Sequence, residues 1–68
     1  MEKLLSYKEN SGQSYRIAGS SLGMDHTTVR QAVVNPWRTT RTTFIEIAEF
    51  FGMPKDEALK EWGESKIK

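Results

Sequence analysis

Turn-forming residues divide this chain of 68 residues into short stretches. They are glycines and prolines: Gly12, Gly23, Pro36, Gly52 and Pro54. Such residues are the strongest local interruptions of regular structure. Between them, apolar residues recur at the three- and four-residue spacing of one helix face, and no stretch alternates apolar and polar residues as a half-buried strand does. We therefore predict an all-α fold, a compact single domain of five short helices that spans residues 1–68.

The first half of the chain has boundary signals for three helices. Residues 1–8 form the first, which ends where the segment ENSGQ begins. Ser14 is a favourable N-cap for a second helix that ends at Leu22. Asp25 caps a third helix, because its carboxylate accepts from free N–H groups and suits the positive end of the helix dipole. This helix should stop near Asn35, since helical geometry is disfavoured in the residue before a proline.

The second half begins with a polar loop, NPWRTTRTT, over residues 35–43. The segment Thr43–Glu46 has the pattern of a capping box, which predicts a fourth helix that ends at Gly52. Pro54 suits the first turn of a fifth helix, because its missing N–H would have no helical acceptor there. The polar tail 63–68 is expected to fray.

The composition excludes several classes of protein. There is no cysteine, so neither a disulfide framework nor a thiolate metal site can form. The single histidine, His26, argues against a zinc site. No apolar run approaches the roughly 20 residues that cross a membrane, and no signal peptide is recognised, so we expect an intracellular, cytoplasmic protein. Without a nucleophile–base pair or a glycine-rich phosphate loop, we expect no enzyme, no cofactor and no small-molecule substrate.

Charge is unevenly distributed along the chain, although the formal net charge is only +1. Residues 14–43 carry four arginines against one aspartate, a net +3, whereas residues 44–68 carry four lysines against six carboxylates, a net −2. The planar group of arginine suits phosphates and guanine edges better than an ammonium does. The middle of the chain is therefore expected to face an anionic partner, and the acidic last third to face away from it.

The third helix has two distinct faces when it is projected at about 100° per residue. Val29 and Ala32 fall on one side and are expected in the core. The opposite side carries Val34 and side chains that can bond base edges in the major groove. These side chains are His26, Thr27, Arg30 and Gln31. An exposed helix face is usually polar, so an ordinary solvated surface is the alternative interpretation, and His26 fits it equally well.

The residues around this helix have the register of a helix-turn-helix over about residues 14–34. Gly19 would let two helices approach, Gly23 would supply the turn, and Val29 would fill the angle between the helices. The segment YRIAGSSLGMDHTTVRQAV resembles the bihelical motif of phage Cro and repressor-type proteins, the lambda-repressor-like family. FIEIAEFFGMPKDEAL, at the expected distance, resembles the segment that follows it. The chain departs from the family at position 19, where alanine is commoner, and in the residues NPW after the third helix.

The resemblance implies roles for individual side chains. His26 and Thr27 would contact bases at the start of the recognition helix, and Gln31 would read a base one turn further on. Arg30, beside Gln31, would reach a guanine or a phosphate. Contacts to the sugar–phosphate backbone are expected from the start of the second helix and from the loop after the third. These residues are Ser14, Tyr15, Arg16, Arg38, Thr40 and Arg41.

We therefore expect a sequence-specific transcriptional regulator of the Cro or repressor type that binds double-stranded DNA. One small module has a limited footprint, so we expect a homodimer on a two-fold operator. The candidate dimer surfaces are Phe50, Trp62, Ile67 and the loop around Trp37. The alternative is a protein-interaction module of the same fold, an anti-repressor or antitoxin-like protein, which the modest net charge favours.

Overall fold

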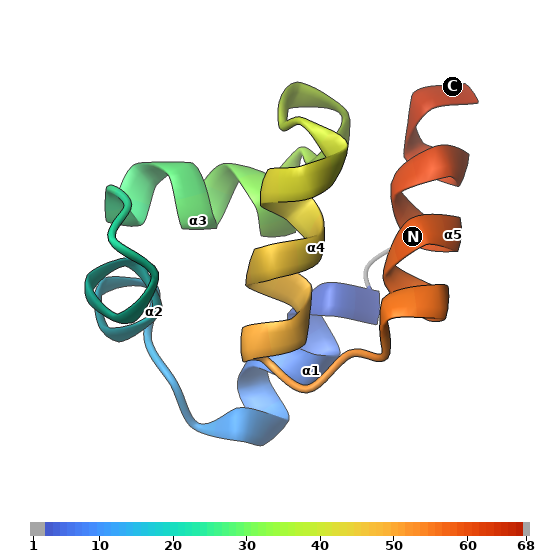
Figure 1. Cartoon of the computed structure of the whole chain (residues 1–68). Coiled ribbons are helices and arrows are strands. Elements are labelled where there is room, and N and C mark those ends of the chain that lie inside the picture. The colour runs from blue at the N-terminus through green and yellow to red at the C-terminus, as the bar shows by residue number, and fades with distance from the viewer. Residues whose placement is uncertain (1–2, 68) are drawn as a thin grey trace.

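Five α-helices account for most of the chain in the computed structural model, which describes residues 3–67 and, for side chains, residues 3–65 (Figure 1). They are α1 (Lys3–Ser11), α2 (Tyr15–Leu22), α3 (His26–Val34), α4 (Arg41–Phe50) and α5 (Lys55–Ile67). A turn of 3₁₀ helix, η1 (Pro36–Arg38), follows α3, and there is no strand among the described residues. Within that range no helix is both long and apolar enough to cross a bilayer. The predicted all-α fold with five helices is confirmed.

Side-chain caps determine where α2 and α3 begin. Ser14 Oγ accepts a hydrogen bond from the backbone N–H of Ile17 at 3.1 Å. Asp25 Oδ1 accepts one from the backbone N–H of Thr27, also at 3.1 Å. These N–H groups lie in the first turn, where a helix offers them no carbonyl acceptor. Both predicted caps, and with them the starts of both helices, are confirmed.

The start of α4 differs from the prediction. Thr40 is the N-cap: its Oγ1 accepts from the backbone N–H of Thr43 at 3.3 Å and donates to Thr43 Oγ1 at 3.0 Å. The predicted capping box at Thr43–Glu46 is therefore wrong, and the predicted loop 35–43 shrinks to η1 and three residues. Both threonines suit an N-cap, but capping at Thr40 adds a turn in which the Phe44 N–H donates to the Thr40 carbonyl at 2.9 Å. The extra turn satisfies backbone groups that a loop would leave to solvent.

Two helix ends also extend beyond their predicted limits. The first helix continues to Ser11, where its prediction stopped at residue 8; its predicted residues 1–2 lie outside the described part of the chain. The last helix continues to Ile67, so the prediction that the tail frays is wrong over 63–67, and residue 68 lies outside the described part. Tertiary packing explains this second extension, because Glu61 and Ser65 are each only 2% exposed. A helix end packed against the domain does not fray as a solvated one does.

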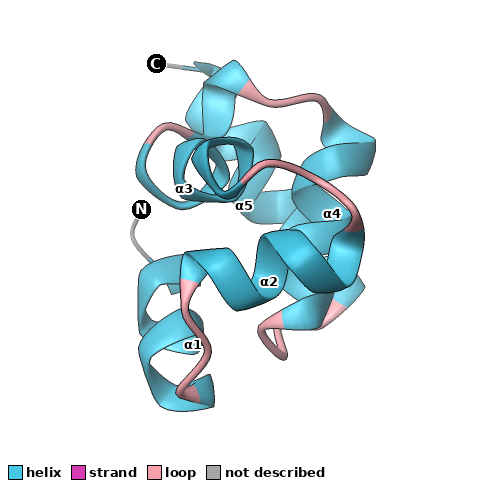
Figure 2. Ribbon diagram, turned by 90° about the vertical axis from the view of Figure 1, so that its left-hand side faces the viewer, coloured by secondary structure: helices cyan, strands magenta, loops and turns pink. Residues whose placement is uncertain are grey.

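The core lies between α3 and α4, with the remaining helices around them (Figures 1 and 2). The most extensive helix packing pairs α2 with α3 and α4 with α5. The buried apolar residues are Leu4, Ala18, Val29, Ala32, Val33, Phe44, Ile47, Ala48, Phe51, Met53 and Ala58. Each large side chain among them contributes about 1.5–3 kcal/mol by its removal from water. Because α3 supplies three of these residues from one side, its opposite side is left at the surface.

A hydrogen bond ties the segment after α3 to the last helix. The indole N–H of Trp62 donates to the Thr39 carbonyl at 2.9 Å, and Thr39 is itself buried. Of the candidate dimer surfaces, Trp62 and Phe50 are half-buried and pack against the core, whereas Trp37 remains 43% exposed. The side chain of Ile67 lies outside the described residues. Trp37 is therefore the most accessible of these aromatic residues.

Candidate nucleic-acid interface

A tight turn joins α2 to α3. Gly23 adopts the left-handed conformation with φ 71°, which favours glycine. The Met24 N–H then donates to the Gly19 carbonyl at 2.8 Å. A β-carbon at position 19 would lie 2.6 Å from the Met24 carbonyl oxygen and 3.2 Å from the His26 nitrogen. Position 19 therefore requires glycine in place of the commoner alanine, because the backbone of the turn passes too close to leave room for a β-carbon.

The turn makes α2 and α3 cross steeply. Figure 1 shows α2 end-on while α3 lies across the view, and Figure 2 reverses the relation. A steep crossing after a short turn that contains glycine is a feature that helix-turn-helix motifs share. It leaves the whole length of α3 accessible from one side.

The two faces predicted for α3 are confirmed. Val29 and Ala32 are fully buried, and Val33 joins them in the core. His26, Thr27, Arg30 and Val34 are exposed, and Gln31 is half-buried. The structure therefore brings the four proposed base-reading residues together on one surface.

The start of this surface is organised by Asp25. Asp25 Oδ1 accepts a hydrogen bond from the Thr27 N–H and lies 3.2 Å from His26 Nδ1. The side chains of Asp25 and His26 are each more than half exposed. The carboxylate occupies the position that an anion would take at this helix start. A DNA phosphate is therefore disfavoured here, whereas a base edge with hydrogen-bond donors or acceptors is not.

A second side-chain pair lies at the other end of α3. Asn35 Nδ2 donates to Gln31 Oε1 at 3.0 Å. The same asparagine is the C-cap of the helix, and its backbone N–H donates to the Gln31 carbonyl at 2.7 Å. The sequence analysis missed Asn35, although the four-residue separation of an amide pair on a helix was a usable signal.

The predicted phosphate contacts before α3 gather at the start of α2. Ser14 caps the helix, and the first-turn N–H groups of Tyr15 and Arg16 have no helical acceptors. The Lys8 ammonium lies 4.6 Å from the centroid of the Tyr15 ring, which adds a cation beside these groups. Lys8 was missed as well, and no local pattern connects it with a helix that begins seven residues later. This site suits an anion, because it combines a neutral cap and free N–H groups with two cations, Lys8 and Arg16.

The predicted phosphate contacts after α3 are less well gathered. Arg38 is exposed in η1, next to Trp37. The Thr40 hydroxyl is engaged in capping α4. Arg41 lines an open groove of about 410 Å³ between α4 and α5, which it shares with Glu46 and Lys55. Of the three residues, Arg38 has the surroundings best suited to a phosphate.

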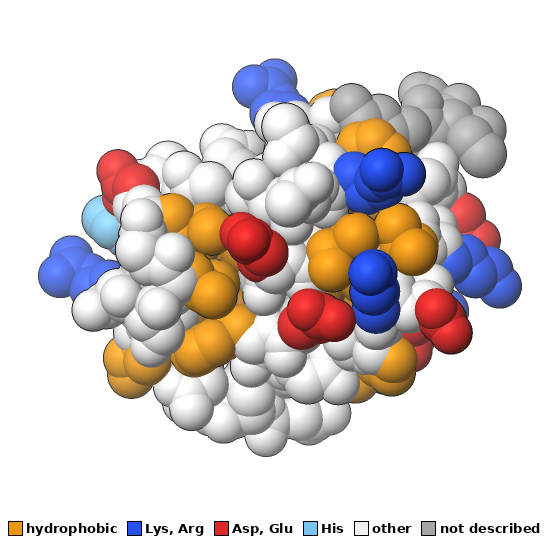
Figure 3. All heavy atoms as spheres, viewed as in Figure 1, with side chains coloured by type: hydrophobic (Ala, Val, Ile, Leu, Met, Phe, Trp, Pro, Cys, Tyr) orange, Lys and Arg blue, Asp and Glu red, His pale blue; other side chains and the backbone are white. Residues whose placement is uncertain are grey.

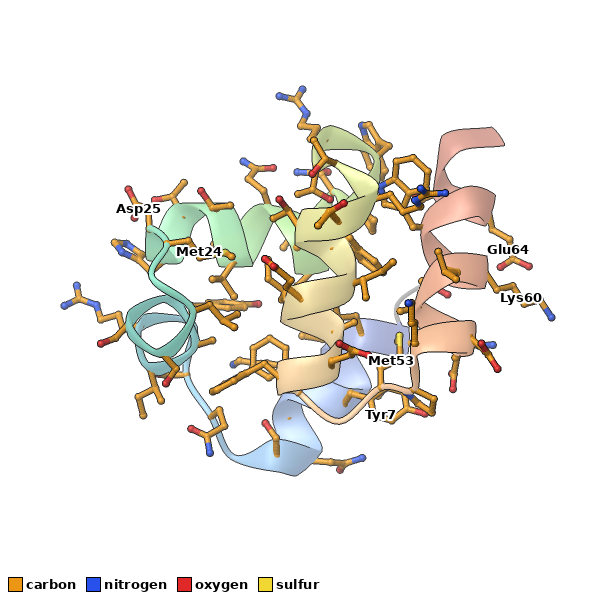
Figure 4. The ribbon with its side chains drawn as sticks, viewed as in Figure 1. Tyr7, Met24, Asp25, Met53, Lys60 and Glu64 are labelled. Carbon is orange, nitrogen blue, oxygen red and sulfur yellow. The ribbon has the colours of Figure 1, made fainter. Side chains whose placement is uncertain are left out.

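Charged side chains of both signs lie on the face of the molecule that carries α4 and α5 (Figure 3). Figure 4 shows Asp25, at the start of α3, and Glu64 and Lys60, on α5, at opposite ends of the view. Figure 3 shows hydrophobic side chains among both acidic and basic ones on the face that carries α4 and α5. Nowhere in the described part of the chain do three or more His, Cys, Asp or Glu side chains gather as a metal site would require. The mixed charge of the α4–α5 face suits a phosphate backbone poorly.

No protein-family model, curated protein or solved structure matches the chain significantly. A function therefore has to be inferred from the α2–α3 geometry and from the side chains that this geometry exposes.

Proposed function

We propose that the protein is a sequence-specific transcriptional regulator of the Cro or repressor type, which inserts α3 into the major groove of double-stranded DNA. The observation that carries the proposal is the row of hydrogen-bonding side chains on the outer face of α3, opposite a face that is buried. The nine residues of α3 form a rod about 14 Å long. The major groove is about 12 Å wide and admits such a helix.

Each end of the surface has its own part in binding. His26 and Thr27 meet base edges at the start of α3, and Arg30 and Gln31 meet them one turn on. The start of α2, with Tyr15 and its neighbours, holds one phosphate through free N–H groups and cations. Arg38 holds another beyond α3. Phosphate contacts orient the protein on DNA, and the base contacts supply the sequence preference.

A homodimer on DNA is compatible with the dimensions of the domain. Its principal extents are 30 × 21 × 16 Å, whereas equivalent half-sites on one side of the duplex are about 34–36 Å apart. One copy therefore covers one half-site, and a two-fold operator takes two copies. Such a regulator acts in the bacterial cytoplasm, whether a phage or its host encodes it.

Selection from a pool of random duplexes tests the proposal. The purified protein should enrich one motif with two-fold symmetry at low salt. Arg30→Ala and Gln31→Ala should each relax one position of the motif and cost about 1–3 kcal/mol of binding free energy. Lys60→Ala, on the far side of the molecule, is the matched control and should leave the motif intact. Absence of any enriched motif would overturn the proposal.

A protein partner is the second candidate, as for an anti-repressor or an antitoxin-like module. The observation in its favour is apolar exposure just beyond the reading surface, where Val34 is 52% and Trp37 43% exposed. Salt dependence separates the two functions. Two copies with two phosphate contacts each would lose about 100-fold in affinity for DNA between 50 and 200 mM salt. An apolar interface with a protein would show no comparable loss.

A further inference from the structure

The contact between Gln31 and Asn35 determines which atoms of Gln31 remain for a ligand. A glutamine amide has one oxygen acceptor and one NH₂ donor group, on opposite sides of its terminal carbon. Here Gln31 Oε1 accepts from Asn35 Nδ2 at 3.0 Å, so the oxygen points along the helix toward its C-terminal end, where Asn35 lies. The NH₂ group is consequently directed away from Asn35.

The position of Asn35 is itself well determined. Its backbone N–H caps α3 by donating to the Gln31 carbonyl at 2.7 Å, and its side chain is half-buried. Pro36, which follows it, is buried and restricts the backbone of the residue before it. Two hydrogen bonds, one from the main chain and one from the side chain, therefore join Asn35 to Gln31.

A glutamine with its oxygen engaged reads DNA differently from a free one. A free glutamine can bond adenine through both amide atoms, donating to N7 and accepting from the N6 amino group. A glutamine that offers only NH₂ is matched by a base with a carbonyl at the groove edge. Guanine offers the acceptors N7 and O6, and thymine offers O4. Adenine keeps one acceptor, N7, beside its amino donor, and cytosine has an amino donor alone.

We infer that Asn35 is a positioning residue that turns the Gln31 NH₂ toward the DNA, which favours guanine or thymine over cytosine at the base it contacts and removes the bidentate match to adenine that a free glutamine has. The inference rests on the proposed function of α3 as a recognition helix, and it assigns Asn35 a role in specificity although Asn35 itself need not touch a base.

The test is selection from random duplexes with the full chain and its variants. Gln31→Ala first identifies the motif position that Gln31 reads, because only that position relaxes. At this position the wild type should prefer guanine or thymine over cytosine by about tenfold, with adenine, which accepts at N7 alone, between them. Asn35→Asp replaces the amide donor by a carboxylate, to which the Gln31 NH₂ would turn and donate. The exposed atom would then be the Gln31 oxygen, and the preference should change to adenine or cytosine.

Two further variants distinguish the expected change of base preference from a loss of structure and from the effect of an added charge. Gln31→Glu keeps an oxygen on Asn35 and exposes a second oxygen, so it should give the same change of preference as Asn35→Asp. Asn10→Asp adds the same charge to the exposed last turn of α1 and should leave the preference unchanged. A loss of structure would lower binding to every sequence alike, and it could not exchange one base class for the other.

The outcomes separate the inference from the proposed function. A motif in which the Gln31-dependent position prefers adenine or cytosine in the wild type overturns the inference and leaves the function standing. So does a preference that Asn35→Asp leaves unaltered while Gln31→Glu, which offers only acceptors, changes it. No enriched motif with any of these proteins overturns the proposed function, and the inference with it.

Discussion

Gly19 lies so close to Met24 that a β-carbon on the glycine would be 2.6 Å from the Met24 carbonyl oxygen. The obstructing atom belongs to the backbone of the turn that directs α3, so it cannot move aside as a flexible side chain would. The orientation of α3 relative to α2 therefore depends on the absence of a single methyl group.

Gly19→Ala should destabilise the protein. Helix propensity alone would favour alanine by about 1 kcal/mol, but forcing a β-carbon into this contact should cost more, about 1–3 kcal/mol net. Thermal and urea unfolding measure the difference. Gly63→Ala is the matched control, because a β-carbon there meets no atom within 4 Å in the middle of α5, and it should stabilise by up to about 1 kcal/mol. A Gly19→Ala protein that melts at or above the wild-type temperature would contradict this account.

Thr40→Ala should cost about 1 kcal/mol of unfolding free energy, as the loss of an N-cap does. Thr43→Ala should cost less, because Thr43 lies inside α4 and contributes a hydroxyl to the cap without capping the helix itself. Urea unfolding of the two variants side by side measures the order of the two effects. If Thr43→Ala cost more than Thr40→Ala, α4 would begin at Thr43, as the capping box expected from sequence predicts.

Glu61→Met should stabilise the protein by about 1–2 kcal/mol, measured by chemical unfolding. Glu61 is 2% exposed, and its Oε2 has no hydrogen-bond partner among the residues that the structure describes. Methionine would fill a similar volume without a carboxylate to desolvate. Glu64→Met, at an exposed position on the same helix, should change the stability by less than about 0.5 kcal/mol. A destabilised Glu61→Met protein would show that the carboxylate has a favourable partner in solution.

Stability should fall at alkaline pH because of a contact between the first and last helices. The Tyr7 hydroxyl donates to Glu57 Oε1 at 2.8 Å. This hydrogen bond, followed by burial and by the negative charge of Glu57, raises the pKa of Tyr7 above its ordinary 10.0. The folded state thus holds the phenolic proton more tightly than the unfolded state does. The stabilisation is complete below the ordinary pKa and is lost as pH rises through the higher value of the folded protein.

Melting temperatures between pH 8 and pH 11 measure this loss. Tyr7→Phe should be less stable near neutral pH and should lose less stability over the alkaline range. Tyr15→Phe retains the contact of Tyr7 with Glu57 and should keep the alkaline loss of the wild type. Equal alkaline slopes for the wild type and Tyr7→Phe would show that another group is responsible.

Local signals explain why the first half of the fold could be predicted from sequence. The caps Ser14 and Asp25 and the left-handed Gly23 act within a few residues of their own position, so the boundaries of α2 and α3 follow from short segments. The projection of α3 was likewise sufficient to separate Val29 from Arg30.

The errors arose where the outcome depends on distant residues. Thr40 and Thr43 are equally suitable caps in isolation, and the choice between them depends on the extra turn that begins at Arg41. The tail after Trp62 is polar, contains a glycine and has no cap, so sequence predicts fraying. Burial of Ser65 against the domain keeps it helical instead. The position of Lys8 over the Tyr15 ring follows from how α1 packs, which no local pattern encodes.

The hydrogen bond from Trp62 to the Thr39 carbonyl has a practical consequence. Trp37 precedes Arg38 in η1 and is 43% exposed, and Trp62 donates to the carbonyl of the residue that follows Arg38. Indole emission reports on contact with solvent, so the chain contains an intrinsic fluorescence probe for the segment just beyond α3. A ligand that covers this segment would shift the emission of Trp37, with the sheltered Trp62 as an internal reference, and no external dye would be needed.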